Sequence, residues 1–308
     1  MERRTDLIME VHESLTRGTN QPMAGVRVEH SRQDEVDITS VQVEPGEGAQ
    51  ALGKAPGRYV TLEAMQLCTD GEAVPQVCEV LAHHLAKLLP KGEGGVLVVG
   101  LGNRQVTPDF IGPGTVDRVL STRGVPGLEA LEQVCAIAPG VRGMTGMESS
   151  EVVAAMVGQV RPRAVIAVDA LAARSVKRLM GTIQLCDTGI SPGSGVGNHR
   201  NGLNADTVGV PVIAVGVPTV VDGATLTCDV MDVLRQRLSG EIPQLEGLDL
   251  EQHYEEMVRA LHGEGQSIMV TPKGVDLLVQ RLCRTLAGGI NLALNPALSL
   301  EEVERLSW

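Results

Sequence analysis

Short apolar runs alternate with amphipathic stretches along most of this 308-residue chain. Val96–Val99 and Val165–Val168 are uninterrupted apolar runs, a pattern typical of strands that are buried on both faces of a parallel sheet. Apolar residues at helical spacing before and between these runs, as in Pro75–Leu89 and Glu148–Val160, predict helices. The alternation predicts a three-layer α/β domain, in which a central mixed, largely parallel sheet is flanked by helices.

The same patterns predict the remaining elements. Alternating polar and apolar residues predict half-exposed strands at Val36–Val43 and Arg58–Glu63. Residues 1–35 are polar and irregular, and the Ala-rich stretch Leu171–Met180 predicts a helix. Further strands are predicted at Thr182–Cys186, Val212–Val215 and Ile268–Pro272, and further helices at Gly114–Ser121, Val220–Leu238, Glu251–His262 and Lys273–Leu286.

Composition narrows the classes of partner and compartment. The net charge of −12 disfavours direct binding to nucleic acid or to an anionic membrane. The six cysteines show no C-x-x-C spacing, so the sequence predicts neither a zinc site nor a disulfide framework and fits a reducing cytosol. The N-terminus has no apolar signal region, and no run of about 18 apolar residues occurs, so we expect a soluble protein that is not exported.

Two aspartates stand where predicted buried strands end. Asp109 closes the segment that begins at Val96, and Asp169 directly follows Val165–Val168. Ligands of an open parallel sheet collect beyond the carboxyl ends of its strands, so we expect the two carboxylates to share a site. Paired carboxylates can divide the acid and base roles of a hydrolase, although the sequence does not assign them. The alternative for each is a helix-terminal role, with Asp109 in a first turn and Asp169 as an N-cap.

Two glycine-rich segments lack the full pattern of a cofactor-binding loop. Gly100–Asn103 lacks the third glycine of a dinucleotide loop, and Pro192–Gly197 lacks the Lys-Ser/Thr ending of a P-loop. The whole loop at 187–202 is longer than about 12 residues, a length usually linked to function or disorder, and we expect it to border the cleft. No histidine accompanies either aspartate in its motif. The sequence therefore predicts no cofactor and no metal.

A series of motifs carries a resemblance to one known family. They are Arg4–Leu7, Gly57–Ala64, Val98–Asn103, Val106–Asp109, Pro139–Gly146, Asp169–Ser175, Asp187–Asn198, Gly216–Asp222 and Met269–Lys273. On these motifs the chain resembles the germination protease, or spore protease, of spore-forming bacteria, from near the N-terminus to about Asn295.

The resemblance implies an atypical aspartic endopeptidase whose fold is similar to that of hydrogenase maturation proteases. It places the family's two essential aspartates on Asp109 and Asp169. The implied substrates are the small acid-soluble spore proteins that coat DNA in dormant spores, cleaved after an acidic and before an apolar residue. The implied setting is the cytoplasm of the forespore and the spore core, where degradation of these proteins begins at germination.

The resemblance also implies a homotetramer that is made as a zymogen and removes its own N-terminal segment. The family's processing point falls between Asp6 and Leu7. Residues 1–6 are therefore the candidate propeptide, and residues 7–308 form a single protease domain.

Two other functions are compatible with parts of the sequence. Peptidyl-tRNA hydrolases also carry a strand like Val98–Asn103, but they need a histidine soon after it and a basic face for RNA. A non-catalytic module could instead bind an anion with the 187–202 loop, in which case replacing Asp109 or Asp169 would leave function intact. No histidine stands between Asn103 and Asp109, and the net charge of −12 does not suit RNA binding. Neither alternative is therefore favoured.

Overall fold

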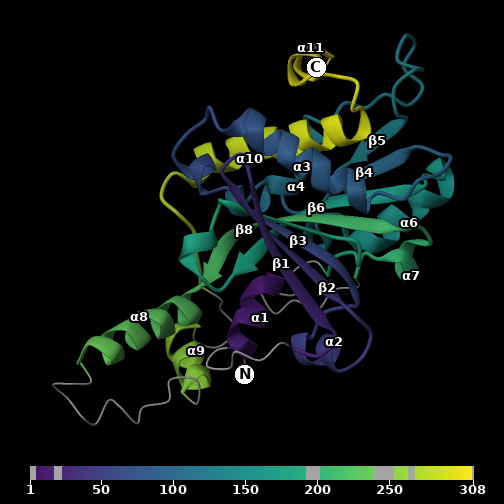
Figure 1. The fold of residues 1–308 in the computed structure, drawn as a ribbon. Coiled ribbons are helices and arrows are strands. Elements are labelled where there is room, and N and C mark those ends of the chain that lie inside the picture. The colour runs from purple at the N-terminus through teal and green to yellow at the C-terminus, as the bar shows by residue number, and fades with distance from the viewer. Residues whose placement is uncertain (1–4, 17–22, 192–201, 239–252, 263–267, 307–308) are drawn as a thin grey trace.

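A mixed β-sheet runs through the computed structural model, which describes residues 5–16, 23–191, 202–238, 253–262 and 268–306 (Figure 1). The strand order is β1-β2-β3-β7-β8-β6-β4-β5, and β9 pairs with β8. The strands are β1 (Val26–Gln33), β2 (Val36–Val43), β3 (Gly57–Glu63), β4 (Val96–Gly100), β5 (Val134–Ile137), β6 (Ala164–Ala173), β7 (Thr182–Cys186), β8 (Val212–Asp222) and β9 (Met269–Val270).

The sheet has a parallel half and an antiparallel half. β4 pairs in parallel with β5 and β6, and β6 pairs in parallel with β8. β1, β2, β3, β7 and β8 pair in antiparallel fashion in that order. The uninterrupted apolar runs form the parallel half, where both faces of each strand are covered.

Helices cover both faces of the sheet (Figure 1). One face carries α3 (Val74–Leu88), α4 (Ile111–Val116) and α10 (Val275–Leu294), and the other carries α1 (Ile8–Thr16), α2 (Glu47–Leu52), α6 (Ser149–Val160) and α7 (Ala205–Val208). The remaining helices are α5 (Arg142–Thr145), α8 (Gly223–Leu238), α9 (Tyr254–His262) and α11 (Leu300–Leu306), with short 3₁₀ turns at η1 (Met65–Cys68), η2 (Thr107–Asp109) and η3 (Val176–Arg178). Within the described ranges, no helix combines the length and the apolar character needed to cross a membrane.

Side chains of the central strands divide between two cores. Val96 and Val98 of β4 pack with α3 and α10, whereas Leu97 and Val99 pack with α6 and α7. This split follows from the period of two along a strand, which sends successive side chains to opposite faces. The predicted three-layer α/β fold with a mixed sheet is thereby confirmed.

The predicted helix at Leu171–Met180 is wrong, because β6 continues through Ala173. Its last residues pair with β8, with an irregularity in register between Leu171 and Ala172, and only the turn η3 follows. Alanine favours a helix in isolation, but pairing with a buried neighbouring strand overrides that preference here.

The expectation of an irregular N-terminal region is also wrong. Residues 8–16 form α1, and Leu7 and Ile8 are fully buried. β1 pairs along its whole length with β2, although most of its residues are exposed. Val26 and Val28 are half-buried against the core, but every residue after them in this edge strand is exposed. The alternation is therefore too short to predict a strand.

We predict an acid-sensitive contribution to stability from His84 in α3. Burial, followed by the nearby charges of His83 and Lys87, lowers the pKa of His84 from 6.5 to about 4. The unfolded chain therefore binds more protons between these two pH values, and the free energy of unfolding falls as the pH drops through this window. We expect His84→Gln to remove about 1 kcal/mol of that loss, a figure reduced for the partial exposure of the ring.

Denaturant unfolding at pH 7 and pH 5 measures this difference. His253→Gln, which removes an exposed histidine just before α9, is the control and should retain the wild-type pH dependence. An equal loss of stability in wild type and His84→Gln would contradict the prediction.

Candidate active site

Asp109 lies at the end of η2, in the connection from β4 to α4. The main-chain N–H of Asn103 donates to Asp109 Oδ2 at 2.8 Å, and the N–H of Asp109 donates to the carbonyl of Val106 at 2.9 Å. The side chain is half-buried. These contacts fold the connection back on itself and fix the direction of the carboxylate.

Gly102 makes this tight connection possible. Its φ of +118° is a conformation that other residues rarely adopt, and a Cβ at this position would lie 2.1 Å from the main-chain oxygen of Asp109. The same Cβ would lie 3.0 Å from Asp109 Oδ1. Gly102 thus serves the close approach of Asp109, and Gly100 serves that of Gly112, where a Cβ would lie 2.2 Å from the main-chain oxygen. Both glycines therefore have a structural reason unrelated to a dinucleotide.

Asp169 lies inside β6 rather than at its end, so the alternative role as the N-cap of a helix is wrong. Asp169 is 4% exposed, and its main chain pairs with Gly216 of β8. The main-chain N–H of Ala170 donates to Asp169 Oδ1 at 2.9 Å. The main chain before and after Asp169 therefore belongs to the sheet, which fixes the position of this residue.

Asp109 and Asp169 line the same cavity, in agreement with the expectation that the two carboxylates meet at one edge of the sheet. The cavity has a volume of about 330 Å³. Segments from six parts of the chain contribute to its wall: Asp6, the β4–α4 connection, Val141 and Ser149, the second half of β6, Thr219 and Val220 of β8, and Met269 and Thr271 near β9. A space of this size accepts a peptide side chain and the bond beside it. The catalytic role of the two aspartates stays a prediction.

Asp6 also lines this cavity, which places the candidate processing bond beside the two aspartates. Its main-chain N–H donates to the carbonyl of Ala172 at 2.9 Å, and its Oδ2 accepts the N–H of Ala172 at 2.9 Å. The N-terminal segment is therefore bound along the last part of β6. The family resemblance implies a processing point between Asp6 and Leu7 but does not indicate this contact.

Two polar side chains that the sequence did not single out bind the carbonyl oxygen of Asp6. Lys54 Nζ donates to it at 2.9 Å, and Gln184 Nε2 donates to it at 3.3 Å. Burial lowers the pKa of Lys54, although the nearby Asp6 and Cys186 favour its charged form. Both contacts join residues far apart in the chain, so no local pattern could reveal them.

Other predicted features have different outcomes. Residues 192–201 of the glycine-rich loop lie outside the described residues, and the described parts of the loop do not line the cavity.

The six cysteines are free thiols, and burial raises the pKa of Cys78 to about 12 and that of Cys283 to about 11. Over the described ranges, no three His, Cys, Asp or Glu side chains are grouped to hold a metal ion.

Comparison with known proteins identifies the family. The sequence model of germination protease matches residues 3–247. Germination proteases of Clostridium acetobutylicum and Priestia megaterium are 39% and 36% identical to this chain, over 98% and 95% of it and 98% and 93% of their own lengths. The NiFe hydrogenase maturation protease HycI of Thermococcus kodakarensis aligns at 17% identity with 44% of this chain and 80% of its own, with a TM-score of 0.31. The chain belongs to the germination protease family.

Proposed function

We propose that this protease is an atypical aspartic endopeptidase that begins the degradation of small acid-soluble spore proteins during germination. The observation that carries the proposal is the shared cavity of Asp109 and Asp169, delivered from two neighbouring parallel strands. Membership of a protease family supports the reaction class, and the relatives' name supports a role in the germinating spore. No observation favours a peptidyl-tRNA hydrolase or an anion-binding module.

The reaction needs one carboxylate that is ionised and one that is protonated. The ionised carboxylate takes a proton from water, which attacks the peptide carbonyl carbon. The protonated carboxylic acid donates to the carbonyl oxygen or to the leaving nitrogen, and the carbon–nitrogen bond breaks. Two carboxylates in one cavity favour this division, because placing two like charges close together is costly. Asp109 and Asp169 fill these two roles in an order that we leave open.

The N-terminal segment supports the proposed preference for an acidic residue before an apolar one. Asp6 places its carboxylate in the cavity against the N–H of Ala172, and Leu7 is fully buried. A main-chain N–H selects for a negatively charged acceptor at that point. A substrate with an acidic residue followed by an apolar residue would make the same two kinds of contact.

The chain is also proposed to cut itself between Asp6 and Leu7, which makes residues 1–6 a propeptide. Asp6, the residue before this bond, lines the cavity that is also lined by both aspartates. Lys54 and Gln184 already donate to the carbonyl oxygen of Asp6, and such donors stabilise the negative charge that develops there when water attacks.

We further propose that the protein acts as a homotetramer inside the spore. α8 extends away from the sheet and carries exposed apolar side chains at Val230, Val233 and Leu234, each at least half exposed (Figure 1). A group of exposed apolar residues on one helix is a common feature of surfaces that associate with another chain. The number of copies rests on the family resemblance.

We expect Asp109→Asn and Asp169→Asn each to slow cleavage of a small acid-soluble spore protein by at least about 100-fold, because each change removes an acid or base from the reaction. Mass spectrometry of the substrate after incubation with processed enzyme gives both the rate and the position of the cut. Each variant should be compared at equal folded concentration.

Asp117→Asn is the matched control for these variants. This aspartate pairs with Arg104 at the surface and does not line the cavity. It should cleave at close to the wild-type rate. Cleavage that survives in Asp109→Asn or Asp169→Asn would show that another group carries the reaction.

We expect Lys54→Met to slow self-cleavage roughly 100-fold, because it removes a donor from the carbonyl oxygen of the bond to be cut. The measurement is the intact mass of the purified full-length chain over time, which falls when residues 1–6 are released. Lys91→Met removes an exposed lysine after α3 and should leave the rate unchanged. Normal processing of the Lys54 variant would exclude its proposed role.

A further inference from the structure

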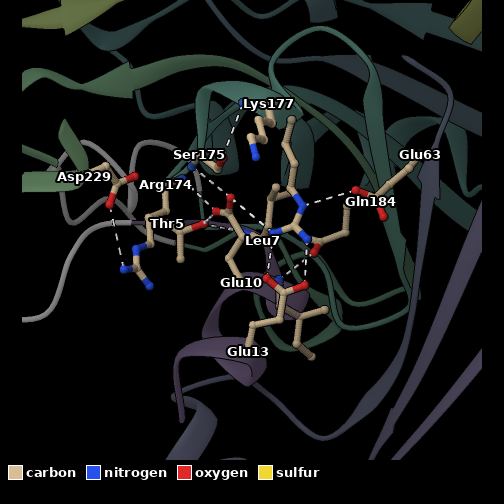
Figure 2. Close-up of polar contacts among 12 residues, drawn as sticks. Thr5, Leu7, Glu10, Glu13, Glu63, Arg174, Ser175, Lys177, Gln184 and Asp229 are labelled. Carbon is tan, nitrogen blue, oxygen red and sulfur yellow. Dashed lines mark hydrogen bonds and ion pairs between the residues drawn. The ribbon is translucent and has the colours of Figure 1, made fainter. Parts of the chain in front are cut away.

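Glu10 holds a buried carboxylate close to the candidate processing bond. It lies in the first turn of α1 and is 3% exposed. Its carboxylate accepts the main-chain N–H of Arg174 at 2.7 Å and that of Ser175 at 3.0 Å, and it also accepts the hydroxyl of Thr5 (Figure 2). A buried charge without such partners would be strongly disfavoured. These contacts join the start of α1 to the residues that follow β6.

Among the described residues, one guanidinium beside Glu10 is shared by several carboxylates. The guanidinium of Arg178 pairs with Glu10 at 3.4 Å, with Glu13 at 2.7 Å and with Glu63 at 3.2 Å. Burial opposes the charged form of Arg178, but these carboxylates outweigh it and raise its pKa. One guanidinium thus faces three carboxylates, and a second cation beside Glu10 would be stabilised by the same charges.

The hydroxyl of Thr5 stands between this carboxylate and the main chain of Leu7. The N–H of Leu7 donates to Thr5 Oγ1 at 3.1 Å, and the hydroxyl in turn donates to Glu10 (Figure 2). Leu7 directly precedes α1, and Glu10 is the third residue of that helix. In a capping box, a glutamate at this position reaches back to the N–H of the residue before the helix. Glu10 therefore has the reach to bind the Leu7 nitrogen itself when Thr5 is gone.

Hydrolysis of the bond between Asp6 and Leu7 creates that situation. Water adds across the amide, Asp6 leaves with a new carboxylate, and Leu7 keeps the nitrogen as an amine whose pKa of about 7.7–8.0 leaves it mostly protonated at neutral pH. A positive charge at the start of a helix is unfavourable without a carboxylate partner. Building on the self-processing proposed above, we propose that the α-ammonium group of Leu7 binds the Glu10 carboxylate in the place of Thr5.

This ion pair helps to hold the end of β6, the strand that carries Asp169. Removal of the propeptide takes away the contact of Asp6 with Ala172, which holds the last part of β6 in the unprocessed chain. Glu10 keeps its hold on the N–H of Arg174, directly after that strand. Glu10 is therefore a positioning residue, which keeps the new N-terminus and the end of β6 together after processing.

Competitive labelling of amines tests the proposal. The full-length chain is allowed to process itself, and the folded product is treated with a limiting amount of an amine-acylating reagent at pH 7. Mass spectrometry then gives the labelled fraction of the Leu7 amine. An ion pair that raises the pKa of this amine by one unit makes it react roughly tenfold more slowly in wild type than in Glu10→Gln. Glu301→Gln removes an exposed carboxylate of α11 that pairs with Arg305, and it should label close to the wild-type rate.

A second pair of proteins keeps Glu10 unchanged. A removable N-terminal fusion is cut from the folded protein to leave a chain that starts either at Leu7 or, one residue longer, at Asp6. We expect slow labelling of the first amine and fast labelling of the second. Equal rates in this pair, or equal rates in wild type and Glu10→Gln, would overturn the proposal. A full-length chain that never cuts itself would count against self-processing alone, because the fusion supplies the processed end independently.

Discussion

The unequal lengths of β4 and β6 are the constraint on which the site depends. β4 ends beside Val168, whereas β6 continues with β8 as far as Ala173. The extension places Asp169 within a strand, where its main chain is fixed, and it leaves an edge of β6 free of β4. Main-chain groups on such an edge need partners, and Asp6 supplies them to Ala172. One strand therefore positions a candidate catalytic carboxylate and binds the candidate processing segment.

The proposed cut separates polar contacts from apolar anchors. Thr5 and Asp6 are held through hydrogen bonds, which can be exchanged for hydrogen bonds to water when the segment leaves. Leu7 and Ile8 are fully buried, and burial of such side chains contributes about 1.5–3 kcal/mol each. Cleavage after Asp6 would release the first group and retain the second. The start of α1 would then stay in place although its preceding residues are lost.

Elements with a strong local pattern were predictable from the sequence, and elements that depend on distant partners were not. Apolar periodicity revealed α3, and the apolar run revealed β4. The extension of β6 was hidden by Ala-rich residues that are strand-like only because β8 pairs with them. The shared cavity of Asp109 and Asp169 followed from their positions after two apolar runs. Lys54 binds Asp6, 48 positions away, and Glu10 binds Arg174, 164 positions away. Sequence reasoning therefore located the carboxylates but not the groups that hold the segment beside them.

Under the proposed function, one contact explains both self-cleavage and inhibition of the unprocessed chain. Asp6 lines the cavity and brings to it the kind of acidic side chain that a substrate would present, and its carbonyl oxygen is already bound by two donors. A covalently attached segment has an effective concentration on the order of millimolar, so a separate substrate protein competes with it poorly. Hydrolysis turns this competitor into a short free peptide, which is diluted into solvent and loses that advantage. In this proposal, the contact that favours self-cleavage is lost once the propeptide leaves, and the cavity then becomes available to a substrate protein.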